Sequence, residues 1–304
     1  MALLSALVRT NPTTNMITFP PAKINLGLNV IERRADGYHN LETVFYPLPL
    51  TDALEIHEMS TYFPLESPCS LKVTGTDQLC EERANLVYKA YSLIAQDYKL
   101  PRIYAHLHKA IPSQAGMGGG SSDAAYMIRL LNEQFSLGMK TDEMCAYATH
   151  LGADCAFFIT TDIHNPRPYY ATGIGDKLHP FTEQWNVLEG KYLLLVKPPI
   201  AVSTKEAYAG ITPHIPLVNC KDVLYMPIEQ WRDKLINDFE ETVFAIHPQL
   251  ASIKASLYAD GALYAAMSGS GSTIYGIFDT EPDTTSYRLT DYYCKTIHIP
   301  STKE

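Results

Sequence analysis

The residues best suited to chemistry in this sequence form a glycine cluster that runs directly into a helix-forming segment. Residues 116–122 read Gly-Met-Gly-Gly-Gly-Ser-Ser, and apolar side chains recur at helical spacing over 123–135. A turn without β-carbons lets several backbone N–H groups converge on an anion at the start of a helix. The pattern therefore predicts a phosphate-binding loop. The alternative, a flexible glycine linker, is rarely bounded by a strand and a helix.

The loop carries no cation of its own. A Walker loop has Lys directly before Ser or Thr, whereas Gly120 precedes Ser121 here. A candidate cation lies upstream, in a predicted strand over residues 22–31, where Lys23 and Asn25 share the face opposite the apolar side chains. These two side chains either line a polar site or face solvent, and the pattern of the strand alone does not decide between the two.

An aromatic ring and an imidazole follow a predicted hairpin turn. Asp36 and Gly37 form a strong two-residue turn signal, and Tyr38 and His39 come directly after it. Both side chains are therefore expected at the start of the returning strand, beside each other at the tip of a hairpin.

A carboxylate and two histidines have to be weighed against structural roles. Asp154 stands before an apolar segment, where it either caps a helix or is held in a partly dry functional site. Taken alone, this position favours the cap. His106 and His108 share one face of a predicted strand, but no carboxylate or cysteine nearby in the sequence completes a metal site. Structural roles are therefore favoured for His106 and His108.

The elements that must position these groups follow from hydrophobic periodicity. Strands are expected at 22–31, 41–50, 53–58, 103–108 and 191–197, with a strand, a glycine turn and a second strand over 263–278. Helices are expected at 85–98, 123–135, 142–150, 203–209, 231–246 and 249–258. Residues 64–75 look irregular, and 165–190 form a loop-rich junction with several Pro and Gly.

Length and composition indicate two soluble domains. The 304 residues are long for one core, and 46% hydrophobic with 19% charged residues is ordinary for globular proteins. We expect an extension over 1–15, an N-terminal domain over 16–165 and a C-terminal domain over 166–304. The net charge of −9 argues against nucleic-acid binding, and no apolar run reaches the ~18 residues of a membrane span. Six cysteines without a Cys-x-x-Cys pair fit reduced thiols in the cytoplasm.

Three motifs in this order resemble the GHMP kinases, small-molecule kinases that use ATP without a Walker loop. They are residues 21–25 (Pro-Ala-Lys-Ile-Asn), 112–124 with the glycine cluster, and 267–273 (Met-Ser-Gly-Ser-Gly-Ser-Thr). The resemblance implies an α+β, two-domain GHMP kinase fold. Its N-terminal domain would be ribosomal-protein-S5-like and β-rich, and its C-terminal domain a ferredoxin-like α/β sandwich.

Three further segments narrow the implied activity within that family. They are residues 34–39 (Arg-Ala-Asp-Gly-Tyr-His), 151–154 (Leu-Gly-Ala-Asp) and 237–240 (Asn-Asp-Phe-Glu). They imply transfer of the ATP γ-phosphoryl group to the 2-hydroxyl of a cytidine-diphosphate-linked methylerythritol, in the non-mevalonate isoprenoid pathway. Alternatives are kinases of homoserine, mevalonate or a sugar, which would not need the Tyr38 and His39 pair, or a non-catalytic binding module of this fold.

The resemblance also implies roles for individual residues. Asp154 would accept the hydroxyl proton, Lys23 would hold Asp154 ionised and stabilise developing charge, and Asn25 would fix the substrate polyol. Tyr38 would stack on cytosine, His39 would bond its edge, and Tyr208 would close the stack. Nucleotide binding falls to Lys109, Pro112, Ser113, Gln114, Ala115, Gly116, Met117, Gly118, Gly119, Gly120, Ser121 and Ser122.

The implied cofactors are ATP and Mg²⁺, because the metal bridges phosphate oxygens. The protein ligands of the metal are not readable from the sequence. We expect a monomer or weak homodimer in the cytoplasm, without nucleic acid or membrane. The chain departs from the family where Cys155 and Ala156 follow Asp154, since an apolar residue and then Pro are usual there.

Overall fold

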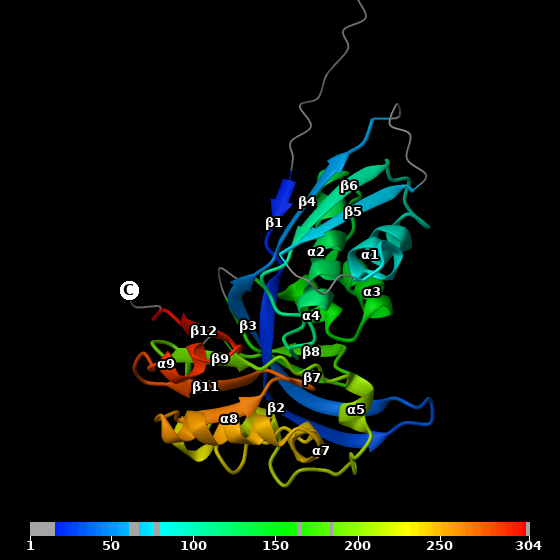
Figure 1. Cartoon of the computed structure of the whole chain (residues 1–304). Coiled ribbons are helices and arrows are strands. Elements are labelled where there is room, and N and C mark those ends of the chain that lie inside the picture. Colours follow the sequence, from blue (N-terminus) through cyan, green and yellow to red (C-terminus); the bar gives the residue numbers. More distant parts are fainter. Residues whose placement is uncertain (1–15, 61–66, 76–79, 163–165, 183–184, 302–304) are drawn as a thin grey trace, which may run out of the picture.

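The computed structural model describes residues 16–60, 67–75, 80–162, 166–182 and 185–301. The predicted extension over residues 1–15 lies outside the described residues. In the described part, three four-stranded sheets combine with helices packed against them (Figure 1). No helix of this part is long and apolar enough to cross a membrane.

The first sheet and its helices form the upper part of Figure 1. The strand order is β1 (Met16–Thr18), β4 (Ala53–Glu58), β6 (Ile103–His108) and β5 (Cys69–Thr74). The helices packed beside it are α1 (Leu86–Ile94), α2 (Gly119–Gln134), α3 (Thr141–Leu151) and α4 (Cys155–Thr160), with a short 3-10 helix, η1 (Glu82–Ala84), before α1. Their apolar side chains share one core with those of β4 and β6. The glycine cluster therefore lies between a strand and a helix, as predicted.

The second sheet is built on a long hairpin. Its strand order is β2 (Pro21–Arg33), β3 (His39–Thr51), β7 (Tyr169–Thr172) and β8 (Lys177–Pro180). The register of β2 against β3 shifts between Asn25 and Leu28, so simple alternation does not continue along the whole strand. Gly27 occupies this irregularity with a φ of +73°, where a β-carbon would lie 2.7 Å from the side chain of Leu235. The close approach explains why glycine stands there.

The third sheet lies in the lower half of Figure 1, with α7 and α8 against it. The strand order is β10 (Tyr264–Met267), β11 (Ile274–Phe278), β9 (Tyr192–Lys197) and β12 (Tyr293–His298). The remaining helices are α5 (Thr204–Tyr208), α6 (Cys220–Val223), η2 (Ile228–Gln230), α7 (Phe239–Ile246), α8 (Pro248–Ala259) and α9 (Thr285–Arg288). One core joins this sheet to α5, α7 and α8, and another joins it to β2 and β3.

Three sequence-based expectations about elements were wrong. Residues 64–75 include the strand β5, which pairs in parallel with β6, and 165–190 include β7 and β8. The helix predicted over 231–246 begins only at Phe239. The reason is that the preceding backbone bonds to β2: Leu28 N–H donates to Ile236 O at 2.9 Å, and Asp238 N–H donates to Leu28 O at 2.8 Å.

The domain limits stay a prediction. Strands β7 and β8 follow residue 165 in the sequence, yet they extend the sheet that β2 and β3 begin. The hydrophobic core that joins β2 and β3 to the third sheet likewise draws on residues from both sides of the predicted boundary.

Candidate active site

A buried lysine and a carboxylate from distant parts of the chain form the centre of the site. Lys23 on β2 is only 3% exposed, and its Nζ lies 3.3 Å from Asp154 Oδ2. The ammonium also donates to Asn25 Oδ1 and, at 3.0 Å, to Gly116 O. Burial of Lys23 and Asn25 excludes the solvent-facing alternative for this strand, because a buried ammonium needs charged and polar partners such as these.

The capping interpretation of Asp154 was wrong. Asp154 occupies the residue position before α4, but its side chain makes no capping hydrogen bond. The carboxylate instead faces Lys23 and remains about a third exposed at its side chain. A partly exposed carboxylate beside a fixed ammonium can contact a hydroxyl group of a ligand bound in the cavity.

The glycine cluster lies directly against Lys23 and lines the same cavity. Gly116 and Gly118 have φ of +70° and +69°, and α2 begins directly afterwards at Gly119, earlier than predicted. Lys23 N–H donates to Met117 O at 3.0 Å, so the loop is tied to β2 by its backbone as well. A β-carbon on Gly118 would come within 3.2 Å of the Lys23 side chain. The absence of β-carbons thus allows the loop to approach the cation that the sequence of the loop lacks.

Asn25 links the lysine to the neighbouring strand. Its amide nitrogen donates to Thr43 Oγ1 at 2.8 Å, and Thr43 Oγ1 in turn donates to Gly27 O at 2.6 Å. The side chain of Asn25 is 2% exposed but still lines the cavity. These hydrogen bonds fix the orientation of the Asn25 amide, so a ligand that binds beside Lys23 meets the amide in one defined orientation.

One cavity of about 740 Å³ collects most of the predicted site residues. Its size is within the usual range for small-molecule sites. The predicted residues that line it are Lys23, Asn25, Lys109, all of residues 112–121, Asp154 and Tyr208. Ser122 is fully buried behind the loop, and Tyr38 and His39 are not part of the cavity lining.

Lys109 forms ion pairs with two carboxylates near the start of α2. Its ammonium contacts Asp52 and lies 2.6 Å from Asp123 Oδ2. Burial opposes the charged form of Lys109, but the charges of Asp123 and Asp52 outweigh it and raise the pKa of the ammonium. Burial also raises the pKa of Asp123. Lys109 is therefore not a solvated lysine; its ammonium is held between Asp52 and Asp123, close to the start of α2.

The predicted base-binding residues lie at the tip of the β2–β3 hairpin. Tyr38 is 62% exposed, whereas the ring of His39 stacks on Tyr208 with centroids 4.7 Å apart and planes inclined by 17°. Burial, reinforced by the charge of Arg33, lowers the pKa of His39. Burial raises the pKa of Tyr208 to about 12, with a further contribution from Asp154. The structure thus brings His39 to Tyr208 and leaves the face of Tyr38 free.

Several residues of the site were not assigned from sequence. Residues 269–271, within the third motif, line the cavity, and the buried Ser268 donates from Oγ to Gly116 O at 2.9 Å. Asp52 and Asp123 hold Lys109, as described above. The apolar side chains of Val73, Leu86 and Leu107 also line the cavity, together with Asn85. The motif at 267–273 was the signal for the turn, but nothing local in the sequence marks Asp52.

Metal-ligating side chains do not cluster in the described part of the chain. Among the residues that the structure describes, no group of three His, Cys, Asp or Glu side chains is placed to hold a metal ion. His106 bonds Thr74 Oγ1 at 2.9 Å and lies 3.3 Å from Glu55 Oε1, which agrees with the structural role favoured from sequence.

Comparison with known proteins identifies the class of this chain. The family described as GHMP kinases N terminal domain matches residues 85–161, and GHMP kinases C terminal matches residues 226–293. The chain belongs to the GHMP kinase family, and it is an ATP-dependent small-molecule kinase with the α+β fold predicted from its motifs.

Relatives with much higher identity share one name. A protein of Bacteroides thetaiotaomicron named 4-diphosphocytidyl-2-C-methyl-D-erythritol kinase is 50% identical over 266 residues, which cover 88% of this chain and 93% of that protein. A Bacteroides fragilis protein of the same name is 47% identical over 282 residues, covering 92% and 98%.

Solved structures agree with this placement. A crystal structure of 4-(cytidine 5'-diphospho)-2C-methyl-D-erythritol kinase superposes with a TM-score of 0.73 at 29% identity, covering 93% of this chain and 99% of that one. Mevalonate kinase of Methanococcus jannaschii reaches 0.65 at 14% identity, covering 94% and 98%. This second likeness shows the fold alone.

Proposed function

We propose that this chain transfers the γ-phosphoryl group of ATP to the 2-hydroxyl of 4-diphosphocytidyl-2-C-methyl-D-erythritol, giving the 2-phosphate and ADP. The single observation that carries a kinase site here is the Lys23–Asp154 pair, 3.3 Å apart, which lines one cavity together with the glycine loop that Lys23 contacts. The substrate, and with it a place in the non-mevalonate isoprenoid pathway, is supported by the relatives at 45–50% identity. Each of them is named 4-diphosphocytidyl-2-C-methyl-D-erythritol kinase.

The proposed chemistry needs positioning and charge stabilisation more than covalent catalysis. Asp154 accepts the proton of the substrate hydroxyl, since its carboxylate is open to the cavity. Lys23 keeps Asp154 ionised by its charge and stabilises the charge that develops on the transferred group. Asn25, held by Lys23 and Thr43, orients the polyol of the substrate.

The nucleotide is proposed to lie along the glycine loop, with its phosphates at the start of α2. Backbone N–H groups of residues 116–120 and the positive end of this sixteen-residue helix favour an anion there. Lys109 contributes to the wall of the nucleotide site, while its ammonium stays bound to Asp52 and Asp123. The apolar side chains of Val73 and Leu86 in the cavity lining are the surface that we propose for the base.

Mg²⁺ is proposed to enter with ATP. The donor set of the cavity fits an ion that keeps phosphate oxygens and water as its main ligands, because Mg²⁺ in kinases is commonly held this way. Ser121 lines the cavity at the helix start and is the hydroxyl we propose to face the ion or the phosphate, whereas Ser122 is fully buried. When bound, the ion would neutralise charge on the phosphate oxygens.

The cytidine group is proposed to bind at the hairpin tip. The exposed ring of Tyr38 offers a stacking face, and His39 offers a ring nitrogen to the base edge. Tyr208 already stacks on His39, so we propose that it closes the cytidine site as its second aromatic wall. Tyr208 also lines the central cavity, which connects the two parts of the site.

We further propose that the enzyme works in the cytoplasm as a monomer or weak homodimer, without nucleic acid or a membrane as partner. The net charge of −9 supports the absence of a nucleic-acid partner. All six cysteines are free thiols, which suits a reducing compartment.

A substrate panel tests the proposal. The purified chain is incubated with ATP and Mg²⁺ together with the cytidine-linked alcohol, mevalonate, homoserine or a hexose, and ADP release is followed. ADP should form rapidly only with the cytidine-linked alcohol, and phosphorus NMR should locate the new ester on the 2-hydroxyl. Comparable turnover with mevalonate or homoserine would rule out the proposed substrate.

A further inference from the structure

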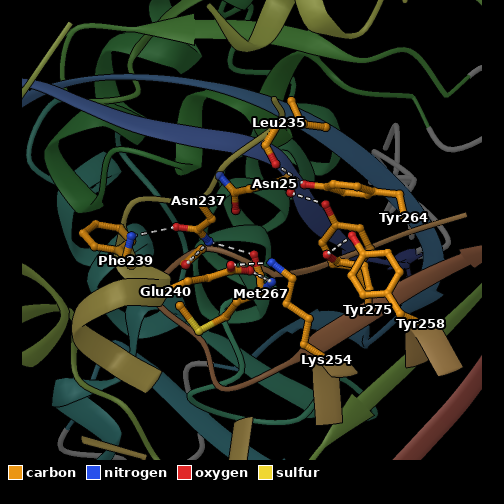
Figure 2. A network of polar contacts seen from close by, with 12 residues as sticks. Asn25, Leu235, Asn237, Phe239, Glu240, Lys254, Tyr258, Tyr264, Met267 and Tyr275 are labelled. Atoms are coloured by element: carbon orange, nitrogen blue, oxygen red, sulfur yellow. Dashed lines mark hydrogen bonds and ion pairs between the residues drawn. The ribbon is translucent and has the colours of Figure 1, made fainter. Parts of the chain in front are cut away.

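Strand β10 lies at the open edge of the third sheet, next to the active site. An edge strand presents N–H and C=O groups that no neighbouring strand bonds. At Met267, the last residue of β10, both groups take side-chain partners instead: its N–H donates to Glu240 Oε1 at 2.7 Å, and its C=O accepts from Asn237 Nδ2 at 2.7 Å (Figure 2). Two side chains thus replace the missing strand at this point.

Asn237 uses its whole amide for this purpose. Besides Met267 O, its Nδ2 donates to Gly269 O at 2.8 Å, and its Oδ1 accepts from Phe239 N–H at 3.0 Å. The residue is 2% exposed. An asparagine buried with all of these bonds made fixes the backbone it touches, because leaving any of the groups unpaired would be costly.

Glu240 is held in turn by Lys254. Glu240 Oε2 lies 2.6 Å from Lys254 Nζ, and the two side chains are 12% and 24% exposed. The ion pair therefore joins α7, which carries Glu240, to α8, and Figure 2 shows both side chains converging on Met267. Glu240 consequently reaches Met267 from a position fixed by two helices.

The turn that follows Met267 lies against Gly116 and close to Lys23. A β-carbon on Gly269 would lie 3.1 Å from Gly116 O and 3.4 Å from Lys23 Nζ. Gly116 O accepts from both Ser268 Oγ, at 2.9 Å, and Lys23 Nζ, at 3.0 Å. A shift of the turn at 268–271 would therefore move Gly116 O. It would also move the Lys23 ammonium that bonds this carbonyl and so change its distance from Asp154.

We propose that Asn237 and Glu240 are positioning residues for phosphoryl transfer. They fix the end of β10 and the turn at 268–271, which holds Gly116 O and Lys23 in place. This inference rests on the proposed function for the roles of Lys23 and Asp154. A displacement of about 1 Å in a catalytic group can lower the rate about a hundredfold, so a small shift of the turn has a measurable effect.

Replacing Asn237 with Asp provides the first test. Asn237→Asp keeps the shape but puts carboxylate oxygens against the carbonyl oxygens of Met267 and Gly269. We expect kcat to fall by roughly tenfold to a hundredfold, while KM for the cytidine-linked substrate changes less than about threefold. The residue touches no substrate in the proposed complex, so loss of binding is not expected.

The matched control is Asn132→Asp. Asn132 on α2 also bonds backbone atoms with its amide, donating to Met139 O at 3.1 Å and accepting from Met139 N–H at 2.9 Å, and it does not line the cavity. This variant should lose stability but keep its kcat. Rates are measured at a temperature where both variants are folded and are normalised to the fraction that binds an ATP analogue.

A pair of variants at Glu240 keeps the proposal testable if Asn237→Asp does not fold. Glu240→Gln retains an oxygen that can accept from Met267 N–H, whereas Glu240→Ala does not. We expect Glu240→Ala to lower kcat about tenfold or more and Glu240→Gln to restore most of it. Ser268→Ala, which removes only the hydroxyl bond to Gly116 O, should lower kcat in the same direction with little effect on KM.

Two results would overturn the inference. One is a kcat for Asn237→Asp equal to that of Asn132→Asp after normalisation; the other is an equal kcat for Glu240→Ala and Glu240→Gln. The variants are assayed with whichever alcohol the unaltered protein phosphorylates in the substrate panel. A different preferred alcohol would therefore refute the proposed substrate and leave the comparison of variants intact.

Discussion

Replacing Gly116 with Ala tests whether the phosphate loop depends on direct contact with the second glycine turn. A β-carbon at Gly116 would lie 1.9 Å from Ser268 O and 3.0 Å from Gly271 N. Real β-carbons essentially never come closer than 3.0 Å to a heavy atom of this kind, so the two turns must separate by about 1.1 Å. Both are backbone, and no flexible side chain can absorb the shift.

Two costs follow from this geometry. The φ of +70° at Gly116 is unfavourable for Ala by about 1–2 kcal/mol, which lowers the free energy of unfolding. The separation moves Gly116 O, which Lys23 contacts, by about an ångström, and this can lower kcat about a hundredfold. A hundredfold loss corresponds to about 2.7 kcal/mol of activation free energy.

Gly138→Ala separates these two costs. Gly138 has a φ of +74°, but nothing lies within 4 Å of its β-carbon position, so Ala there meets the same backbone penalty without a clash. Denaturant unfolding should show a loss of about 1–2 kcal/mol for this control, with an unchanged kcat. If Gly116→Ala turned over the substrate as fast as Gly138→Ala, the contact between the two turns would not matter for catalysis.

Three further predictions concern the substrate side of the site. Asp154→Asn should lower kcat by about 10²–10⁴-fold and leave the Kd of an ATP analogue nearly unchanged in calorimetry; near-native turnover would show that another group is the base. Tyr38→Ala should raise KM for the cytidine-linked substrate by about fivefold to 150-fold, since stacking a base on an aromatic ring contributes about 1–3 kcal/mol, and an unchanged KM would exclude the stack. Because burial and Arg33 lower the pKa of His39 below its ordinary 6.5, the ring is neutral at neutral pH and becomes charged only as the pH falls. The same KM should therefore be flat from about pH 7 to 9 and rise only as the pH falls below the ordinary histidine value of 6.5; a KM that rises already near pH 7 would contradict the neutral ring.

Local patterns in the sequence predicted much of the fold. Strands β4 and β6 begin and end where alternation placed them, and α1, α2 and α3 differ from their predicted bounds by a few residues. These elements follow from the side-chain period and from glycine or asparagine at their ends, which nearby residues decide. Strand β5 was missed although Cys69, Leu71 and Val73 alternate with polar residues, so its own pattern is typical of a strand; only its parallel pairing with β6 depends on tertiary structure. The segment at 231–238 was taken for helix because its bonds to β2 are not visible in its own sequence.

The sequence by itself determined the chemical groups and their order: a lysine on a strand, a glycine loop at a helix start, and an aspartate beyond the next helix. The meeting of Lys23 and Asp154 followed from the family resemblance and not from any local pattern, and the structure places the two groups 3.3 Å apart. Tertiary structure alone decided that Lys109 is held by Asp52 and Asp123 and that Asn237 completes the open edge of β10. The physical reason is that each of these contacts crosses between elements. Their formation depends on how sheets and helices pack, which no local periodicity encodes.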